Sequence, residues 1–157
     1  MPDGLDNLFK IVISSDHGGA DMKCVLKEYL ESFGHSVTDF GVRSGEMSDY
    51  PDRAIPVVDA LITGAADRGI LLCGSGIGIS IAANRFPGIR AALCHDECTA
   101  RLSRQHNDAN VLVLGGRVIG IDVAKYITKI WFSTEFEGGR HNSRIEKIDE
   151  IARKFWK

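Results

Sequence analysis

The stretch that decides the fold is Ile70-Leu71-Leu72-Cys73-Gly74-Ser75-Gly76-Ile77-Gly78, in which a short apolar run enters a glycine-rich loop. An apolar run of this length, bounded by glycine, is typical of a buried strand, and the residues through Ala83 are helical in character. A buried strand that passes through a short loop into a helix is the repeating unit of parallel α/β sheets. The stretch therefore predicts a parallel sheet with a glycine loop at the carboxyl end of one strand.

The same alternation continues outward from this stretch in both directions. Beside the strand at 70–73, strands are predicted at 9–15, 36–40, 89–94 and 111–114, and helices at about 20–33, from 51 or 52 to 66, and near 96–105 and 120–132. From about residue 140, Ile145, Ile148, Ile151 and Phe155 recur at the spacing of an amphipathic helix. We therefore expect one α/β domain over 1–157. Its core is a three-layer, doubly wound, five-stranded parallel sheet (Rossmann-like), with an extended C-terminal helix.

Composition narrows the class of protein. The 157 residues are 44% hydrophobic and 25% charged, which is ordinary for a globular chain. The formal net charge of −2 argues against nucleic acid as a partner, and no apolar run of about 18 residues predicts a membrane span. The start, Met1-Pro2-Asp3-Gly4-Leu5-Asp6, is acidic and lacks the apolar core of a signal peptide. A cytoplasmic globular protein is the expectation.

The four cysteines, Cys24, Cys73, Cys94 and Cys98, are too few and too scattered for a disulfide framework. The run Cys94-His95-Asp96-Glu97-Cys98 places possible metal ligands close together. No second ligand cluster of matching spacing accompanies it, so a buried thiol beside a helix that Asp96 caps is the better interpretation. We therefore expect no metal at this run.

The glycines at positions 74, 76 and 78 free the backbone to turn its N–H groups toward one point, next to the positive end of a helix. This predicts a local anion site. Residue 79 is Ile, which excludes both a dinucleotide fingerprint and the C-x5-R cradle of a thiol phosphatase, and no Gly-Lys-Ser/Thr of a P-loop is present. Cys73 beside such a loop is either a reactive thiol, nucleophile or base, or a buried cysteine that ends a strand.

Ligands of doubly wound sheets bind beyond the carboxyl ends of the strands. That rule alone selects four groups of residues: Asp16 and His17, the run from Cys73 to Gly78, His95 and Asp96, and the run from Gly115 to Arg117.

Separated motifs across nearly the whole chain resemble the ribose-5-phosphate isomerase B family, which also includes galactose- and allose-6-phosphate isomerases. They are Ser15-Asp16-His17-Gly18-Gly19, Asp49-Tyr50-Pro51, the run from Ile70 to Arg85, Ser103-Arg104-Gln105-His106-Asn107-Asp108-Ala109-Asn110, Gly116-Arg117, and Phe136-Glu137-Gly138-Gly139-Arg140-His141-Asn142-Ser143-Arg144.

This resemblance implies interconversion of D-ribulose 5-phosphate and D-ribose 5-phosphate, in the non-oxidative branch of the pentose phosphate pathway, without a cofactor. By resemblance, Cys73 is the base that removes the proton next to the carbonyl, and His106 opens the sugar ring. The Ser75 hydroxyl, at a position where the family usually has Thr, is implied to donate or accept a hydrogen bond during ring opening. The substrate-binding residues implied are Asp16, His17, Tyr50, Gly74, Gly76, Ile77, Gly78, Asn107, Arg117, Arg140 and Arg144, the last two for the phosphate.

The family also forms dimers or tetramers whose active sites are completed across the subunit boundary, so a homodimer or tetramer is implied. A hexose-6-phosphate isomerase of the same family is the alternative activity. A nucleotide-binding module without enzymatic activity is a more distant one, since it would have no use for Cys73 with His106.

Overall fold

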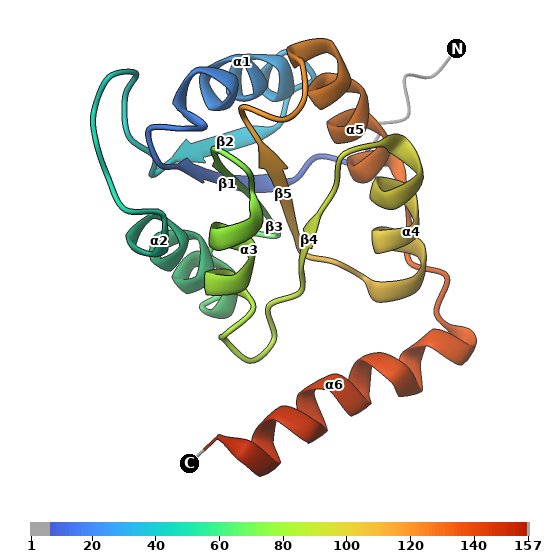
Figure 1. Ribbon diagram of the computed structural model, residues 1–157. Helices are drawn as coiled ribbons and strands as arrows, with labels where there is room; N and C mark the ends of the chain where they lie inside the picture. Colours follow the sequence, from blue (N-terminus) through green and yellow to red (C-terminus); the bar gives the residue numbers. More distant parts are fainter. Residues whose placement is uncertain (1–6, 157) are drawn as a thin grey trace.

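A five-stranded, fully parallel sheet forms the centre of the computed structural model, which describes residues 7–156 (Figure 1). The strands are β1 (Lys10–Ser15), β2 (Ser36–Asp39), β3 (Arg68–Cys73), β4 (Ala91–Leu93) and β5 (Val111–Gly115). Their spatial order is β2-β1-β3-β5-β4, so the chain winds outward from β1 in one direction and from β3 in the other. The predicted doubly wound fold is confirmed.

The helices are α1 (Ala20–Glu31), α2 (Tyr50–Ile62), α3 (Ile77–Ala83), α4 (Glu97–Asn107), α5 (Ile121–Ser133) and α6 (Asn142–Phe155), with a 3₁₀ turn η1 (Gly139–His141) before α6. Because side chains alternate along a strand, the sheet has two apolar faces. Ile11, Ile13 and Leu72 face α1, α4 and α5, where Trp131 is fully buried. Val12, Leu71 and Cys73 face α2 and α3.

Several element ends differ from the sequence expectations. The second helix ends at Ile62 and not at Ala66, because Gly64 adopts a positive φ of 74° and turns the chain. β4 is shorter than predicted: Ile89 and Cys94 lie outside it, and the backbone of Ile89 bonds to Phe86 in a turn. β3 begins two residues early, at Arg68.

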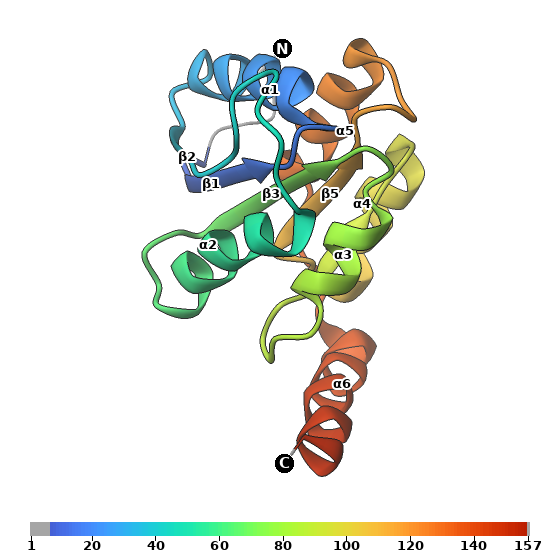
Figure 2. The same cartoon turned by 60° about the vertical axis from the view of Figure 1, so that its left-hand side comes forward.

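α6 extends away from the body of the molecule, as the two views show (Figure 2). None of its described residues is buried. Its apolar stripe includes Ile148, Ile151 and Phe155, which are 51%, 46% and 81% exposed. The predicted amphipathic helix is present, but the sheet does not cover its apolar side.

Candidate active site

Two loops meet at the carboxyl edge of the sheet, between β1 and β3, where the strand order reverses. The Asp16 backbone N–H donates to the Leu72 carbonyl at 3.2 Å, which ties the loop after β1 to the end of β3. A Cβ at Gly18 would lie 2.6 Å from the Gly74 nitrogen, so only glycine allows this approach. The topological switch point, where such sheets bind ligands, is thus built from the two predicted loops.

Cys73 ends β3 and is 4% exposed. Its Sγ accepts a hydrogen bond from the Gly76 backbone N–H at 3.1 Å, while the Ile77 N–H donates to Ser75 Oγ at 3.2 Å. Gly76 has a φ of 77°, a conformation that glycine adopts without strain, and this turn directs its N–H back to the sulfur. The loop therefore presents a hydrogen-bond donor to the thiol sulfur, an arrangement that stabilises negative charge there.

The predicted side chains from three other elements surround this loop. The Tyr50 ring lies over Gly78, where an added Cβ would be 2.7 Å from Cζ. The Arg117 N–H donates to the Gly74 carbonyl at 2.9 Å, and its side chain passes beside the same glycine. His17 Nδ1 lies 3.1 Å from the Ser48 carbonyl, in the loop before α2.

Asp16 is the acidic group of this site. It is 6% exposed, and its Oδ1 accepts the Gly18 N–H at 2.8 Å. Together with the glycine loop, Asp16, His17, Tyr50, Ser75 and Arg117 form one cluster at the carboxyl edge, which we call the thiol site. This cluster can hold a polyhydroxylated ligand by its polar groups and present the sulfur to it.

The other predicted residues, His106, Asn107, Arg140 and Arg144, lie elsewhere in the chain. α4 starts after β4 and runs back against the strand direction, so its last turn is at the amino edge of the sheet (Figure 1). There Asp108 pairs with Arg90, which precedes β4, at 3.3 Å. Because six residues of β3 span roughly 20 Å, His106 and Cys73 of one chain are at opposite edges.

His106 belongs to a second cluster with Glu137 and His141. The two imidazole rings are stacked, with centroids 4.4 Å apart, and Glu137 Oε2 lies 4.0 Å from His106 Nε2 and 3.7 Å from His141 Nε2. His141 is buried, and this burial, with the positive charges of His106 and Arg140, lowers its pKa. We call this set the histidine cluster.

From the motif at 136–144 the sequence predicts roles for Arg140 and Arg144 but none for Glu137 and His141. The signal was the pair of glycines, Gly138 and Gly139, which adopt φ of 65° and 57° and fold Glu137 and His141 toward each other. The helix expected from about residue 140 begins at Asn142, so Arg140 lies in η1 and only Arg144 lies in α6.

The run from Cys94 to Cys98 does not gather metal ligands. Cys94 is 1% exposed, and burial raises the pKa of its thiol to about 11, whereas Cys98 is exposed. Asp96 caps α4, as expected, by accepting the Thr99 N–H at 2.7 Å, and this bond lowers the pKa of the Asp96 carboxyl. The interpretation as a buried thiol beside a helix cap agrees with this geometry.

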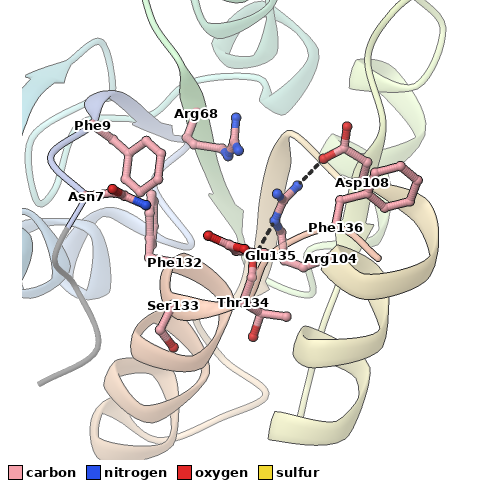
Figure 3. Close-up of a pocket in the computed structure, with 10 residues that line it drawn as sticks. All are labelled: Asn7, Phe9, Arg68, Arg104, Asp108, Phe132, Ser133, Thr134, Glu135 and Phe136. Carbon is pink, nitrogen blue, oxygen red and sulfur yellow. Dashed lines mark hydrogen bonds and ion pairs between the residues drawn. The ribbon is translucent and has the colours of Figure 1, made fainter. Parts of the chain in front are cut away.

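A cavity of about 510 Å³ opens at the amino edge and contains none of the predicted site residues (Figure 3). Its wall includes Arg104, which donates to Asp108 at 2.8 Å and to the Thr134 carbonyl at 3.3 Å. Arg68, above the Phe9 ring, forms another side, and burial with the charge of Arg104 lowers the pKa of its guanidinium. Since Asp108 and Glu135 offset the charges of Arg68 and Arg104, this cavity has no clear preference for an anion.

Residues 11–148 match the Ribose/Galactose Isomerase family. The chain belongs to this family. A solved structure of Clostridium thermocellum ribose-5-phosphate isomerase B superposes with a TM-score of 0.92 at 51% identity, covering 94% of this chain and 99% of that one.

Two curated members of the family bear on the substrate. Ribose-5-phosphate isomerase B of Escherichia coli is 47% identical over 145 residues, 92% of this chain and 97% of that one. D-Erythrulose-4-phosphate isomerase of Pectobacterium atrosepticum is 44% identical over 142 residues, 90% and 93% of the two chains. The family therefore includes isomerases named for sugar phosphates of different lengths. No helix in residues 7–156 is long and apolar enough to cross a membrane.

Proposed function

We propose that this chain is an aldose–ketose isomerase that interconverts D-ribulose 5-phosphate and D-ribose 5-phosphate. One observation carries the proposal: a buried thiol at the switch point of the sheet, hydrogen-bonded by the Gly76 N–H, inside a loop that matches the family. Such an isomerase needs a base that moves one proton between C1 and C2. It also needs donors for the oxygen that becomes negative on the way.

In this proposal Cys73 is that base, and it returns the proton to the neighbouring carbon after a cis-enediolate forms. Some backbone N–H groups of the loop 74–78 make no hydrogen bond inside the loop, and these donate to the enediolate oxygens and stabilise their negative charge. Asp16, His17 and Tyr50 bind the sugar hydroxyls. Arg117, beside the glycine loop, also contacts the substrate. No step requires a metal or an organic cofactor.

Ring opening and phosphate binding belong to the residues at the amino edge. His106 protonates the ring oxygen, Asn107 binds the opened sugar, and Arg140 with Arg144 holds the phosphate by charge-assisted hydrogen bonds. Since these residues are remote from Cys73 in one chain, a complete site requires a second copy. We infer a homodimer in which the amino edge of one chain meets the thiol site of the other. Because such a dimer is symmetric, it contains two complete active sites.

Exposed apolar side chains are placed to support such a dimer. Ile77 and Ile81 on α3, next to the glycine loop, are each 54% exposed, and Ile55 on α2 is 48% exposed. The apolar stripe of α6, which follows the phosphate arginines in the chain, is likewise uncovered. Burying these two surfaces against each other would bring His106 toward Cys73. We place this soluble dimer, as one isomerase domain per chain, in the cytoplasm and in the pentose phosphate pathway.

The test is an isomerisation assay with four-, five- and six-carbon sugar phosphates on the purified, chelator-treated chain. Ribulose 5-phosphate should give the highest kcat/KM, and Cys73→Ala should lower kcat by about 10² to 10⁴ because a general base is lost. Cys98→Ala, which changes an exposed thiol outside the site, is the matched control. A higher kcat/KM for tetrose or hexose phosphates would reassign the substrate, and near-normal turnover of Cys73→Ala would remove its role as the base.

A further inference from the structure

The histidine cluster has the composition of a transition-metal site. Each of His106, Glu137 and His141 offers one ligand atom, and the three atoms all lie within 4.8 Å of one another. Two imidazole nitrogens and one carboxylate oxygen are a ligand set that zinc accepts in proteins, with a remaining position left open. The proposed isomerase activity needs no metal here.

The distances are close to those that a bound ion requires. Ligand atoms on one tetrahedral Zn²⁺ lie roughly 3.3–3.4 Å apart, since each is about 2.0–2.1 Å from the ion. Glu137 Oε2 is 3.7 Å from His141 Nε2 and 4.0 Å from His106 Nε2. All three ligand atoms lie within 4.8 Å of one another, so the set must contract by roughly 0.3 to 1.4 Å to reach the spacing of a tetrahedral ion. The side chains of His106 and Glu137 are 36% and 50% exposed, so both can turn toward the buried His141, and the His106 ring can leave its stacked position to face the ion.

The backbone holds the three residues together without a metal. The Glu137 N–H donates to the Gln105 carbonyl at 3.0 Å, which places Glu137 beside the last turn of α4 and so beside His106. The His141 N–H donates to the Gly138 carbonyl at 3.1 Å, which closes the turn between the other two ligands. His141 itself is 4% exposed and therefore the fixed member of the set.

Charge around the cluster makes Glu137 the decisive ligand. Arg140 and Arg144 are exposed in the same segment, and both raise the electrostatic cost of a cation at His141. Among the three ligands only the Glu137 carboxylate offsets that charge. One carboxylate with two imidazoles also favours Zn²⁺ over Mg²⁺ or Ca²⁺, which prefer sites rich in oxygen ligands.

We propose that His106, Glu137 and His141 form an inhibitory Zn²⁺ site. The binding follows from the cluster alone. The inhibition rests on the proposed function, because an ion on His106 Nε2 occupies the position from which the ring-opening proton is donated. Zinc would thus inhibit ring opening in an enzyme whose reaction uses no metal.

Binding is tested first, by titrating Zn²⁺ into the chelator-treated chain in competition with a chromophoric chelator. The chain should bind zinc, and Glu137→Gln, which keeps the shape and removes the charge, should weaken the affinity at least about tenfold. Glu135→Gln, an exposed carboxylate two residues away, is the matched control and should bind as the unmodified chain does. Cys98→Ser and His95→Asn should also leave the affinity unchanged.

Inhibition is tested next, with the same Zn²⁺ concentrations in the isomerase assay and with Mg²⁺ and Ca²⁺ in parallel. Zinc should inhibit, the chelator should restore full activity, and Glu137→Gln should need at least about tenfold more zinc for half inhibition. The proposed site would be wrong if the chain bound no zinc. It would also be wrong if Cys98→Ser abolished binding while Glu137→Gln left it intact. Binding at the cluster in a chain that isomerises none of the sugar phosphates would instead reject the proposed function.

Discussion

At Cys73 a single turn of backbone determines the surroundings of the sulfur atom. Gly76 can donate to Sγ because its φ of 77° reverses the chain within three residues. A side chain at this position would also meet Leu93 Cδ1 at 2.5 Å and the Leu114 backbone at 3.1 Å. Conformation and space therefore both require glycine, and the thiol gains its donor as a consequence.

Arg144 is the residue at which the proposed phosphate binding is best separated from the proposed proton transfer. It lies in the first turn of α6, is exposed and has no proton-transfer role in the proposed scheme. Arg144→Ala should lower kcat/KM for the phosphorylated sugar by roughly 10- to 100-fold, mainly through KM, because one charge-assisted hydrogen bond is lost. Steady-state kinetics will measure this.

The control is Arg153→Ala, which removes an equal charge from the last turn of the same helix. Its kinetic constants should stay within about twofold of those of the unmodified chain, since an exposed distant charge is largely screened. An unchanged KM in Arg144→Ala would exclude this arginine from the site.

At the scale of elements, His35 joins the start of the sheet to α5. It precedes β2, and its Nδ1 accepts the Phe9 N–H at 3.2 Å. Its ring packs against those of Phe9 and Phe132, with centroid distances of 5.8 and 5.7 Å. His35 Nε2 is buried without a hydrogen-bond partner, so the ring is accommodated in its neutral form. Burial accordingly lowers the pKa of His35.

This lowered pKa predicts that acid destabilises the fold through His35. An unfolded histidine titrates near pH 6.5, so the unfolded chain takes up the proton first as the pH falls. The stabilisation is complete above about pH 6.5 and is lost as the pH falls below that value toward the folded pKa. Urea unfolding at pH 7.5, 6.5 and 5.5 measures the slope.

His35→Asn keeps an oxygen near the place of Nδ1 and cannot titrate. It should be less stable at pH 7.5, because packing is lost, but should show a shallower loss of stability between pH 6.5 and 5.5. His95→Asn changes an exposed histidine and should retain the full slope. Equal slopes in all three proteins would assign the acid sensitivity to other groups.

At the scale of the whole molecule, the fold divides the proposed active site into two halves. The thiol site is at the carboxyl edge and the histidine cluster is at the amino edge, because α4 runs the full height of the sheet between them. The uncovered stripe of α6 lies next to the second half in sequence. The proposed dimer accounts for both features at once.

Mixing two inactive variants tests this arrangement directly. Cys73→Ala keeps the histidine cluster and His106→Ala keeps the thiol site, so a mixed dimer contains one intact site and one doubly defective site. After denaturation together and refolding, random pairing makes half of the dimers mixed, and activity should recover to roughly a quarter of the unmodified level.

Each variant refolded alone is the control and should stay inactive. Sedimentation should show dimers or larger assemblies for all samples. If mixed dimers form but activity does not recover, both halves of the site must come from one chain. That result would reject the proposed dimer, because Cys73 and His106 of one chain lie at opposite edges of the sheet.

Much of the fold could be predicted because local signals and the global topology agree. Apolar runs of four to seven residues, separated by helical stretches, specify a parallel sheet, and Gly34, with φ of 90°, ends α1 near the predicted point. The errors are at element ends, such as the short β4. There an edge strand lacks a second partner, and pairing in the folded sheet, rather than residue preference, sets its length.

The sequence by itself determined which groups the chain possesses: a thiol beside a glycine loop at the end of a predicted parallel strand, and motifs of a sugar-phosphate isomerase family. It did not determine which of those groups meet. Only the tertiary structure separated Cys73 from His106 and joined His106 to Glu137 and His141. The physical reason is that backbone geometry sets these distances. The direction of α4 carries His106 away from Cys73, and the positive φ of Gly138 and Gly139 brings Glu137 and His141 together. Neither effect can be read from the chemistry of a single residue.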